Sequence, residues 1–301
     1  MSLFDGMSGG QQALKELELK IDKYYALEIE KASITITQKN HPETVQLGSV
    51  TEIDFSEYKD EDIDIIIGGF PCRNLTRSVI GRIGYDEGLK GQHSNLFYYL
   101  VEAIKTIKPK YFFVENVESM KDKDKQIISE VLGIEPYMVD SGKYSPQNRK
   151  RYYWTNIPQD SDLLLAENNK TLKDIVLPFE KVPEKYWYKQ DFEFLGNDKS
   201  PVALLDIKGQ DILKRVYGEH QKCPTLTSCR GGHHQKKVLQ NGKPRKLTPL
   251  EYERLQGFPD GYTEGVADTH RYNMLGDGWQ IDVVKKMFSH LTKEFKTVNE
   301  E

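Results

Sequence analysis

The sequence predicts an α/β fold built on a parallel sheet, with a smaller irregular domain attached. The first half of the chain alternates short apolar runs with helical patterns, which is typical of βαβ units. Residues 158–245 are rich in Lys, Asp, Gly and Pro and show no sustained period. A length of 301 residues leaves room for one large domain and one small one.

Local patterns predict the elements of the large domain. Residues 63–67 form an isoleucine-rich run that ends at two glycines, as expected for a strand buried on both faces. Residues 94–107 carry apolar side chains at helical spacing. Strands are expected at residues 1–4, 24–27, 45–47, 63–67, 111–114, 137–139 and 151–155, and helices at residues 11–20, 94–107, 126–132 and 281–295.

The composition narrows the class of protein. Hydrophobic residues make up 38% and charged residues 29%, which are ordinary values for a soluble globular protein. No apolar run approaches the ~20 residues of a membrane span, and residues 1–6 lack the features of a signal peptide. We therefore expect a cytoplasmic protein whose three cysteines are free thiols.

Charge is unevenly distributed along the chain. The net charge of −4 does not indicate nucleic-acid binding. Residues 221–250, however, contain no acidic side chain. The basic side chains of this block are Lys222, Arg230, Lys236, Lys237, Lys243, Arg245 and Lys246. Such a block is a candidate phosphate-facing surface, and a solvated loop is the alternative.

A glycine-containing turn follows the first expected strand, where residues 4–9 read Phe-Asp-Gly-Met-Ser-Gly. Glycines at a strand-to-helix turn let the backbone approach a ligand and present helix N-terminal amides. Glu28 ends the next expected strand, where a carboxylate can accept hydrogen bonds from ribose hydroxyls. The pattern suits NAD or S-adenosylmethionine. The spacing differs from G-x-G-x-x-G, and a plain tight turn is the alternative.

A cysteine lies directly after a buried strand, in the segment Gly-Gly-Phe-Pro-Cys at residues 68–72. The carboxyl ends of strands border the ligand crevice of an open α/β sheet, and Pro71 stiffens the turn. Lone cysteines are usually buried hydrophobes. The position of Cys72, between a proline and an arginine at a strand end, favours a nucleophile.

Two further motifs also lie at strand ends. Glu115 follows a buried strand and could hydrogen-bond a bound base or exchange a proton with it; a helix cap or surface acid is the alternative. Arg149 and Arg151 are two residues apart beside a strand, so their side chains should point the same way. Two such guanidinium groups can bind a carbonyl, carboxylate or phosphate, and an edge-strand charge pair is the alternative.

Taken in order, these motifs resemble the C5-cytosine DNA methyltransferase family over nearly the whole chain. The resembling segments are residues 4–9, 69–72, 95–97, 115–117, 147–151, 245–259 and 275–279. The resemblance implies a Rossmann-like, S-adenosylmethionine-dependent methyltransferase domain at residues 1–157 plus 266–301. It also implies a small irregular target-recognition domain at residues 158–265.

The chain departs from the family pattern at three places. Arg73 stands where a glutamine usually follows the cysteine, and Ser49 stands where the family has an aspartate. Residues 276–279 read Gly-Asp-Gly-Trp in place of Gly-Asn-Ser-Val. None of these changes removes a catalytic group, but two of them lie in the expected cofactor pocket, so an unusual sulfonium cofactor remains open.

The resemblance implies a mechanism. Cys72 would add to C6 of the cytosine, Glu115 would contact N3 and the exocyclic amine, and Arg151 would hold O2. Arg149 would support the second arginine or meet phosphate. The cofactor would be S-adenosylmethionine, with S-adenosylhomocysteine as product. Its expected contacts are Phe4, Asp5, Gly6, Met7, Gly9, Glu28, Ile29, Ser49, Val50, Phe70, Pro71, Leu96, Asp277, Gly278 and Trp279.

The expected partner is double-stranded DNA. C6 is inaccessible in a duplex, so the base must be flipped out, which predicts a mobile loop at residues 73–93. The expected DNA contacts are Arg73, Asn74, Arg77, Arg82, Thr225, Thr227, Arg230, Gly231, His233, Lys236 and Arg245. We expect a monomer with no membrane association and no obligate protein partner; a cognate restriction endonuclease is a candidate partner.

Other interpretations remain open. Zinc at Cys223, Cys229, His233 and His234 is disfavoured by the Cys-x5-Cys spacing, so no metal is expected. An RNA cytosine-5 methyltransferase would share the same base chemistry. A catalytically silent DNA-binding relative would not need Cys72, and an NAD-dependent oxidoreductase would not need the Pro-Cys motif.

Overall fold

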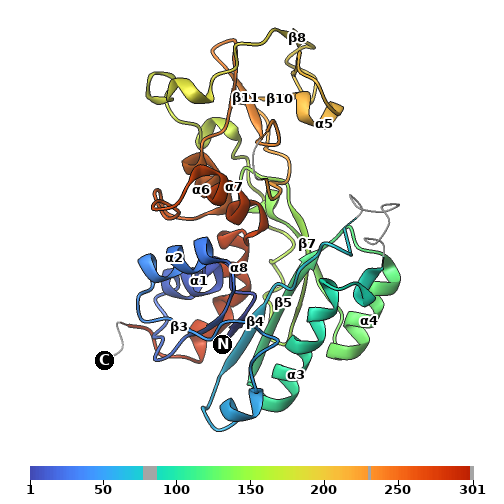
Figure 1. Ribbon diagram of the computed structural model, residues 1–301, viewed down its shortest axis with the longest axis vertical. Coiled ribbons are helices and arrows are strands. Elements are labelled where there is room, and N and C mark those ends of the chain that lie inside the picture. The colour runs from blue at the N-terminus through green and yellow to red at the C-terminus, as the bar shows by residue number, and fades with distance from the viewer. Residues whose placement is uncertain (77–86, 230–231, 299–301) are drawn as a thin grey trace. The chain divides into compact units, whose positions relative to one another are not determined.

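The computed structural model describes residues 1–76, 87–229 and 232–298 (Figure 1). The chain divides into two compact units. Unit 1 comprises Met1–Asp140, Lys150–Leu163 and Val284–Glu301, and unit 2 comprises Ser141–Arg149 and Leu164–Val283. Residues 266–283, which the sequence analysis assigned to the catalytic domain, thus cluster with the second unit.

Unit 1 is built on a seven-stranded sheet in the order β3-β2-β1-β4-β5-β7-β6. Its strands are β1 (Ser2–Leu3), β2 (Tyr25–Leu27), β3 (Val45–Gln46), β4 (Ile65–Gly68), β5 (Tyr111–Val117), β6 (Tyr137–Asp140) and β7 (Lys150–Thr155). Pairings among β1 to β5 are parallel, whereas β7 is antiparallel to both β5 and β6. The predicted α/β class is confirmed, and the sheet is mixed because of β7.

Helices cover both faces of this sheet (Figure 1). They are α1 (Gly9–Glu16), α2 (Lys31–Asn40), α3 (Phe97–Ile107), α4 (Asp122–Leu132) and α8 (Ile281–Phe288), the last of which runs from unit 2 into unit 1. The helix expected at residues 281–295 ends earlier, because Ser289–Lys293 form a 3₁₀ helix. Helix α2 was not predicted; it buries Ser33, Ile36 and Thr37 at helical spacing.

The centre of the sheet is tightly packed where β1 and β4 meet helix α3. Gly68 ends β4, and a Cβ atom there would lie 2.5 Å from Leu100 Cδ1 and 3.0 Å from the Leu3 carbonyl oxygen. Ile66 and Leu3 are fully buried in the same core. A side chain at this strand end would therefore force Leu100 to move, just before the segment that carries Cys72.

Unit 2 contains a five-stranded sheet in the order β12-β11-β10-β9-β8. Its elements are β8 (Phe192–Phe194), β9 (Ala203–Leu205), α5 (Asp211–Lys214), β10 (Arg215–Gly218), β11 (Lys237–Gln240), β12 (Lys243–Lys246), α6 (Pro249–Gln256) and α7 (Asp268–Asp277). A small core of Val202, Ala203, Leu205, Ile207 and Val216 supports it. The region expected to be irregular thus has a sheet, whose strands of three or four residues are too short to show a period. Among the described residues, no helix is long and apolar enough to cross a membrane.

Candidate active site

The turn after β4 carries Cys72 at the carboxyl end of the parallel strands. The amides of Leu75 and Thr76 donate to the Cys72 carbonyl at 2.9 and 3.1 Å, which closes a turn around the cysteine. Phe70 is buried, and its ring centroid lies 5.1 Å from that of Phe97 at the start of α3. Cys72 itself is a partly exposed thiol. The backbone is therefore anchored on both sides of a cysteine that is only partly buried.

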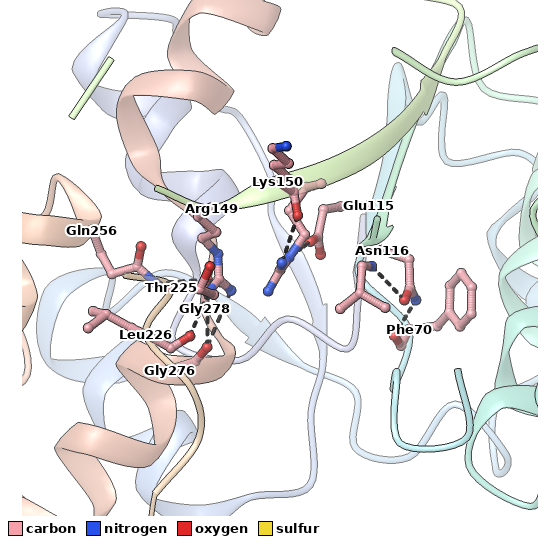
Figure 2. Close-up of polar contacts among 12 residues, drawn as sticks. Phe70, Glu115, Asn116, Arg149, Lys150, Thr225, Leu226, Gln256, Gly276 and Gly278 are labelled. Atoms are coloured by element: carbon pink, nitrogen blue, oxygen red, sulfur yellow. Dashed lines mark hydrogen bonds and ion pairs between the residues drawn. The ribbon is translucent and has the colours of Figure 1, made fainter. Parts of the chain in front are cut away.

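A buried asparagine ties this turn to the neighbouring strand β5. Asn116 is 2% exposed; its Nδ2 donates to the Phe70 carbonyl at 2.9 Å, and its Oδ1 accepts from the Val117 amide at 2.8 Å (Figure 2). Ser94 adds a second link, because its hydroxyl donates to the Pro71 carbonyl at 3.1 Å. The position of the cysteine turn is thus fixed relative to residue 115.

Glu115 and Arg151 form an ion pair on adjacent strands. Arg151 Nε lies 2.8 Å from Glu115 Oε1, and the two side chains are only 13% and 10% exposed. The antiparallel register brings them together, because Val117 pairs with Arg151 and Glu115 pairs with Tyr153. Arg151 also donates to the Lys150 carbonyl at 2.8 Å. The Glu115 carboxylate and the Arg151 guanidinium therefore lie, largely buried, near the carboxyl end of β5. This strand pairs with β4, which leads to Cys72.

Arg149 has a different set of partners, so the expectation that the two arginines present one shared face needs correction. Arg149 is 3% exposed and donates to the carbonyls of Leu226, Gly276 and Gly278, all in unit 2 (Figure 2). Strand β7 begins only at Lys150, so the two-residue alternation of a strand does not extend to Arg149.

The other two cysteines are chemically quiet. Burial raises the pKa of the Cys223 thiol to about 12 and that of Cys229 to about 11. Both side chains are buried, whereas Cys72 is partly exposed. The thiolate is the nucleophilic form, so these two residues are poor candidates for covalent chemistry. Among the described residues, no group of His, Cys, Asp and Glu is placed to hold a metal ion.

The turn between β1 and α1 has an unusual backbone. Phe4, Gly6 and Ser8 all have positive φ, at 57°, 60° and 59°. For Phe4 and Ser8 this left-handed conformation costs about 1–3 kcal/mol each, and such strain is concentrated at functional sites. Met7 and Gly9 are buried at the start of the helix. The turn is held by bonds from the Asp5 amide to the Leu27 carbonyl at 3.1 Å and from the Ser8 amide to the Asp5 carbonyl at 3.1 Å.

Asp5 is a titratable group inside this turn. It accepts hydrogen bonds from the hydroxyls of Ser8 and Tyr24, the latter at 2.9 Å. Burial raises the pKa of the Asp5 carboxyl to about 6, against the opposing effect of its hydrogen bonds. The charge of Glu28 raises it further.

Glu28 joins the turn to the end of β2. Its Oε2 accepts from the Gly6 amide at 2.8 Å, and its Oε1 accepts from the Ile29 and Glu30 amides at 2.7 and 2.9 Å. A carboxylate has about four acceptor positions, so three amides leave room for a ligand hydroxyl. Ile29 is 70% exposed beside it, an apolar side chain presented to solvent.

The remaining expected cofactor residues lie on two units. Ser49 follows Gly48, whose φ is 79°, and its hydroxyl lies 2.8 Å from that of Thr51, while Val50 is buried. Pro71 and Leu96 are partly buried in unit 1. Asp277, Gly278 and Trp279 follow the end of α7 in unit 2, where Asp277 is exposed and the other two are partly buried.

Two of the expected DNA contacts are wrong because their side chains are buried. Arg245 is 0% exposed and forms a bidentate ion pair with Glu251, at 2.8 and 2.6 Å. Asn74 is 5% exposed, and its Oδ1 accepts from the His93 amide at 3.2 Å. Neither side chain is presented to a solvent-borne ligand.

Much of the basic block faces the interior of unit 2, so its interpretation as a phosphate-facing surface needs correction. Lys222 donates to the carbonyls of Gly142, Ser145 and Asn168. Lys237 is 2% exposed, and burial lowers its pKa to about 7. Burial also lowers the pKa of Lys236, another expected DNA contact, and its side chain is only partly exposed. Lys243 is exposed.

The other expected DNA contacts differ in exposure. Arg73 and Thr227 are exposed, while Thr225 is partly buried and donates to the Asn148 carbonyl at 2.7 Å. His233 is partly buried, with Nδ1 3.2 Å from the Tyr188 hydroxyl. The expected contacts Arg77, Arg82, Arg230 and Gly231 lie outside the described residues.

Comparisons with known proteins decide the family. Residues 1–293 match the family described as C-5 cytosine-specific DNA methylase. The chain belongs to this family. The methylase is 26% identical to the Type II methyltransferase M1.ScrFI of Lactococcus lactis subsp. cremoris, over 98% of this chain and 79% of the relative. It is 25% identical to the Type II methyltransferase M.HhaI of Haemophilus parahaemolyticus, over 95% and 91%.

Solved structures share the fold of the methylase. The Dnmt2 methyltransferase of S. pombe matches with a TM-score of 0.74 and 17% identity, covering 97% of each chain. The methyltransferase EhMeth of Entamoeba histolytica matches with a TM-score of 0.73 and 18% identity, covering 98% of each chain. The predicted Rossmann-like fold is confirmed, and the enzyme class is that of the DNA cytosine-5 methyltransferases.

The sequence analysis missed the residues that hold the site of the methylase together. Asn116 was noted only as part of a motif, and Ser94 only as the start of a helix. A buried asparagine in an otherwise apolar strand could have been noticed, because a buried amide requires partners. Gln147 and Gln256 of unit 2 are both 0% exposed and are joined by a hydrogen bond of 2.9 Å, and this pairing had no comparable signal in the sequence.

Proposed function

We propose that the methylase transfers a methyl group from S-adenosylmethionine to C5 of a flipped-out cytosine in double-stranded DNA through a covalent adduct with Cys72. The observation that supports this most strongly is within unit 1. Asn116 links the turn of Cys72 to the strand of Glu115, and Glu115 is paired with Arg151. A nucleophile, a carboxylate and a guanidinium at adjoining strand ends suit addition to an electron-poor ring.

The residues of the β1–α1 turn fit S-adenosylmethionine. Left-handed residues at 4, 6 and 8 shape a turn at the carboxyl edge of the sheet, and Glu28 has an acceptor position suited to a ribose hydroxyl. Ile29 presents an exposed apolar side chain against which an adenine could pack. When bound, the cofactor supplies an electrophilic methyl group on a sulfonium.

The protein residues act on the base. The Cys72 thiolate forms a bond to C6, which turns C5 into a nucleophilic enamine carbon. Glu115 contacts N3 and the exocyclic amine and stabilises the adduct, while Arg151 compensates charge that develops on O2. After methylation, loss of the proton from C5 restores the ring double bond and breaks the bond between C6 and sulfur. The base leaves as 5-methylcytosine with Cys72 regenerated.

Unit 2 is proposed to recognise the DNA. Thr227 is exposed, and it directly follows the buried Leu226 of unit 2. Arg73 of unit 1 is exposed and directly follows the nucleophile in the sequence. The curated relatives are named Type II methyltransferases, which makes a restriction endonuclease of the same specificity a candidate partner. The enzyme is proposed to act as a monomer in the cytoplasm.

The test is a label-transfer experiment. The protein and its Cys72→Ala variant are incubated with unmethylated duplex DNA and methyl-labelled S-adenosylmethionine, and label is mapped by base. Label on cytosine C5 from the wild type alone supports the proposal and gives the target site. Absence of label with intact DNA binding contradicts it, and the same assay with transfer RNA then tests an RNA substrate.

A further inference from the structure

Arg149 lies at the centre of a buried polar cluster in unit 2. Its Nη1 donates to the Leu226 carbonyl at 2.9 Å, and its Nη2 donates to the Gly278 carbonyl at 2.8 Å. Both nitrogens also lie 3.3 Å from the Gly276 carbonyl (Figure 2). Gly276 and Gly278 are at the end of α7, where carbonyls carry the negative end of the helix dipole. The guanidinium therefore joins two segments about fifty residues apart in the sequence.

The two segments touch through their backbones. A Cβ atom on Gly276 would lie 2.3 Å from the Thr227 carbonyl carbon and 2.3 Å from the Ser228 amide nitrogen. Only glycine permits this approach. The Ser228 hydroxyl adds a bond of 2.6 Å to Asn273 Oδ1, one turn earlier on α7. A displacement of the backbone at Gly276 would therefore also displace residues 227 and 228, which are exposed.

Two glutamines form a second route between the same segments. Gln147 Oε1 accepts from the Leu226 amide at 3.0 Å, and Gln147 Nε2 donates to Gln256 Oε1 at 2.9 Å. Gln256 Nε2 in turn donates to the carbonyls of Leu275 and Gly278, at 2.5 and 3.1 Å. Both glutamines are 0% exposed. A buried network with satisfied members rigidifies the groups that it joins.

We propose that Arg149 is a positioning residue that fixes the segment 226–228, whose exposed Thr227 is proposed to contact DNA, to the turn at residues 276–278, where Asp277 and Gly278 are expected cofactor contacts. The contacts of Arg149 with residues 226, 276 and 278, together with the bond from Ser228 to Asn273, are called the clamp below. The consequences of this inference rest on the proposed function, but the clamp itself lies within unit 2. Because the Arg149 side chain is 3% exposed and donates to backbone carbonyls, its proposed role is to hold the two segments together. This role involves no direct contact of Arg149 with phosphate or base.

The test compares Arg149→Lys with a matched control, Arg245→Lys, another buried arginine of unit 2. Lysine keeps the charge but lacks the planar fork that reaches several carbonyls. Binding of S-adenosylmethionine without DNA is measured by calorimetry, and DNA binding is measured over a range of salt. For Arg149→Lys we expect the cofactor dissociation constant and the KM for DNA each to rise about tenfold. We expect the salt slope of DNA binding to stay unchanged, because no phosphate contact is lost.

Hydrogen exchange of the ligand-free protein gives an independent readout. Arg149→Lys should increase exchange in peptides covering residues 224–229 and 272–280, whereas Arg245→Lys should do so near residues 240–251. The milder Ser228→Ala variant, which removes one link of the clamp, should show the first pattern weakly. For Arg149→Lys, three results would each overturn the inference: unchanged exchange in residues 224–229 and 272–280, unchanged affinity for S-adenosylmethionine, or a shallower salt slope of DNA binding. A wild type that binds no cofactor would contradict the proposed function, while exchange would still decide whether the clamp exists.

Discussion

Replacing Asn116 with alanine should misplace the nucleophile more than it unfolds the protein. The side chain makes two buried hydrogen bonds, at 2.9 Å to the Phe70 carbonyl and 2.8 Å from the Val117 amide. The variant leaves both backbone groups without these partners in a site that is 2% exposed. At about 1–2 kcal/mol for each unsatisfied group, the free energy of unfolding should fall by about 2–4 kcal/mol.

The rate of methyl transfer by Asn116→Ala should be affected more strongly than its stability. Phe70 is two residues before Cys72, so release of its carbonyl lets the whole turn shift. A displacement of about 1 Å at a reacting group can lower the rate about 100-fold. We therefore expect kcat for methyl transfer to fall about 100-fold, with little change in KM for DNA. The assay is single-turnover methyl transfer, run at a temperature where thermal denaturation shows the variant to be folded.

Asn156 provides a matched control at the other end of β5. Its Nδ2 donates to the Lys110 carbonyl at 2.9 Å and its Oδ1 accepts from the Phe112 amide at 2.8 Å, but the side chain is exposed. Asn156→Ala should cost less than about 1 kcal/mol, because water replaces the lost partners, and it should keep the wild-type kcat. Equal kcat losses in the two variants, or a wild-type kcat for Asn116→Ala, would refute the reasoning.

Three further predictions follow from the side-chain environments. An alkylating agent at pH 8 should modify Cys72 well before the two buried cysteines, whose raised pKa values keep them as thiols; peptide mass spectrometry that found equal labelling would count against this. Because the folded-state pKa of Asp5 is raised to about 6 from 3.8, the folded state binds the proton more tightly, so stability should fall as pH rises from about 4 to 6. The free energy of unfolding should fall by at most about 3 kcal/mol, and by less than this because the carboxyl is partly exposed. Denaturant titrations of Asp5→Asn should show a free energy of unfolding that depends less on pH. Arg73→Ala should reduce the salt slope of DNA binding by about 0.9, whereas Arg245→Met should leave the slope unchanged and lower stability by about 3–5 kcal/mol; a shallower slope for the latter would restore it as a DNA contact.

The strands that carry the chemistry were predictable because they are buried on both faces. The run that became β4 and the apolar start of β5 are continuous enough to be identified from sequence alone. Helix α2 was missed because its β-branched residues have low helix propensity. It forms nonetheless, since Ser33, Ile36 and Thr37 pack against the rest of unit 1.

Burial of charged groups was the main property that the sequence did not reveal. Arg245 looked like one member of a phosphate-binding block, yet it pairs with Glu251 inside the unit. The sequence did contain a signal, because Thr248 and Glu251 form a capping box at the start of α6, with Pro249 at the first helical position. For Lys222, the partners lie in two distant segments, and only the folded structure brings them together.

The most direct test of the central claim is a covalent trap at Cys72. A duplex carrying 5-fluorocytosine at the methylation site is incubated with the protein and S-adenosylmethionine; fluorine replaces the C5 proton that must leave before the bond to sulfur breaks. We predict a denaturant-stable protein–DNA complex whose modified peptide contains Cys72, and no complex with Cys72→Ala. Methylation of the normal duplex without any trapped complex, or a complex that persists in the variant, would contradict the account.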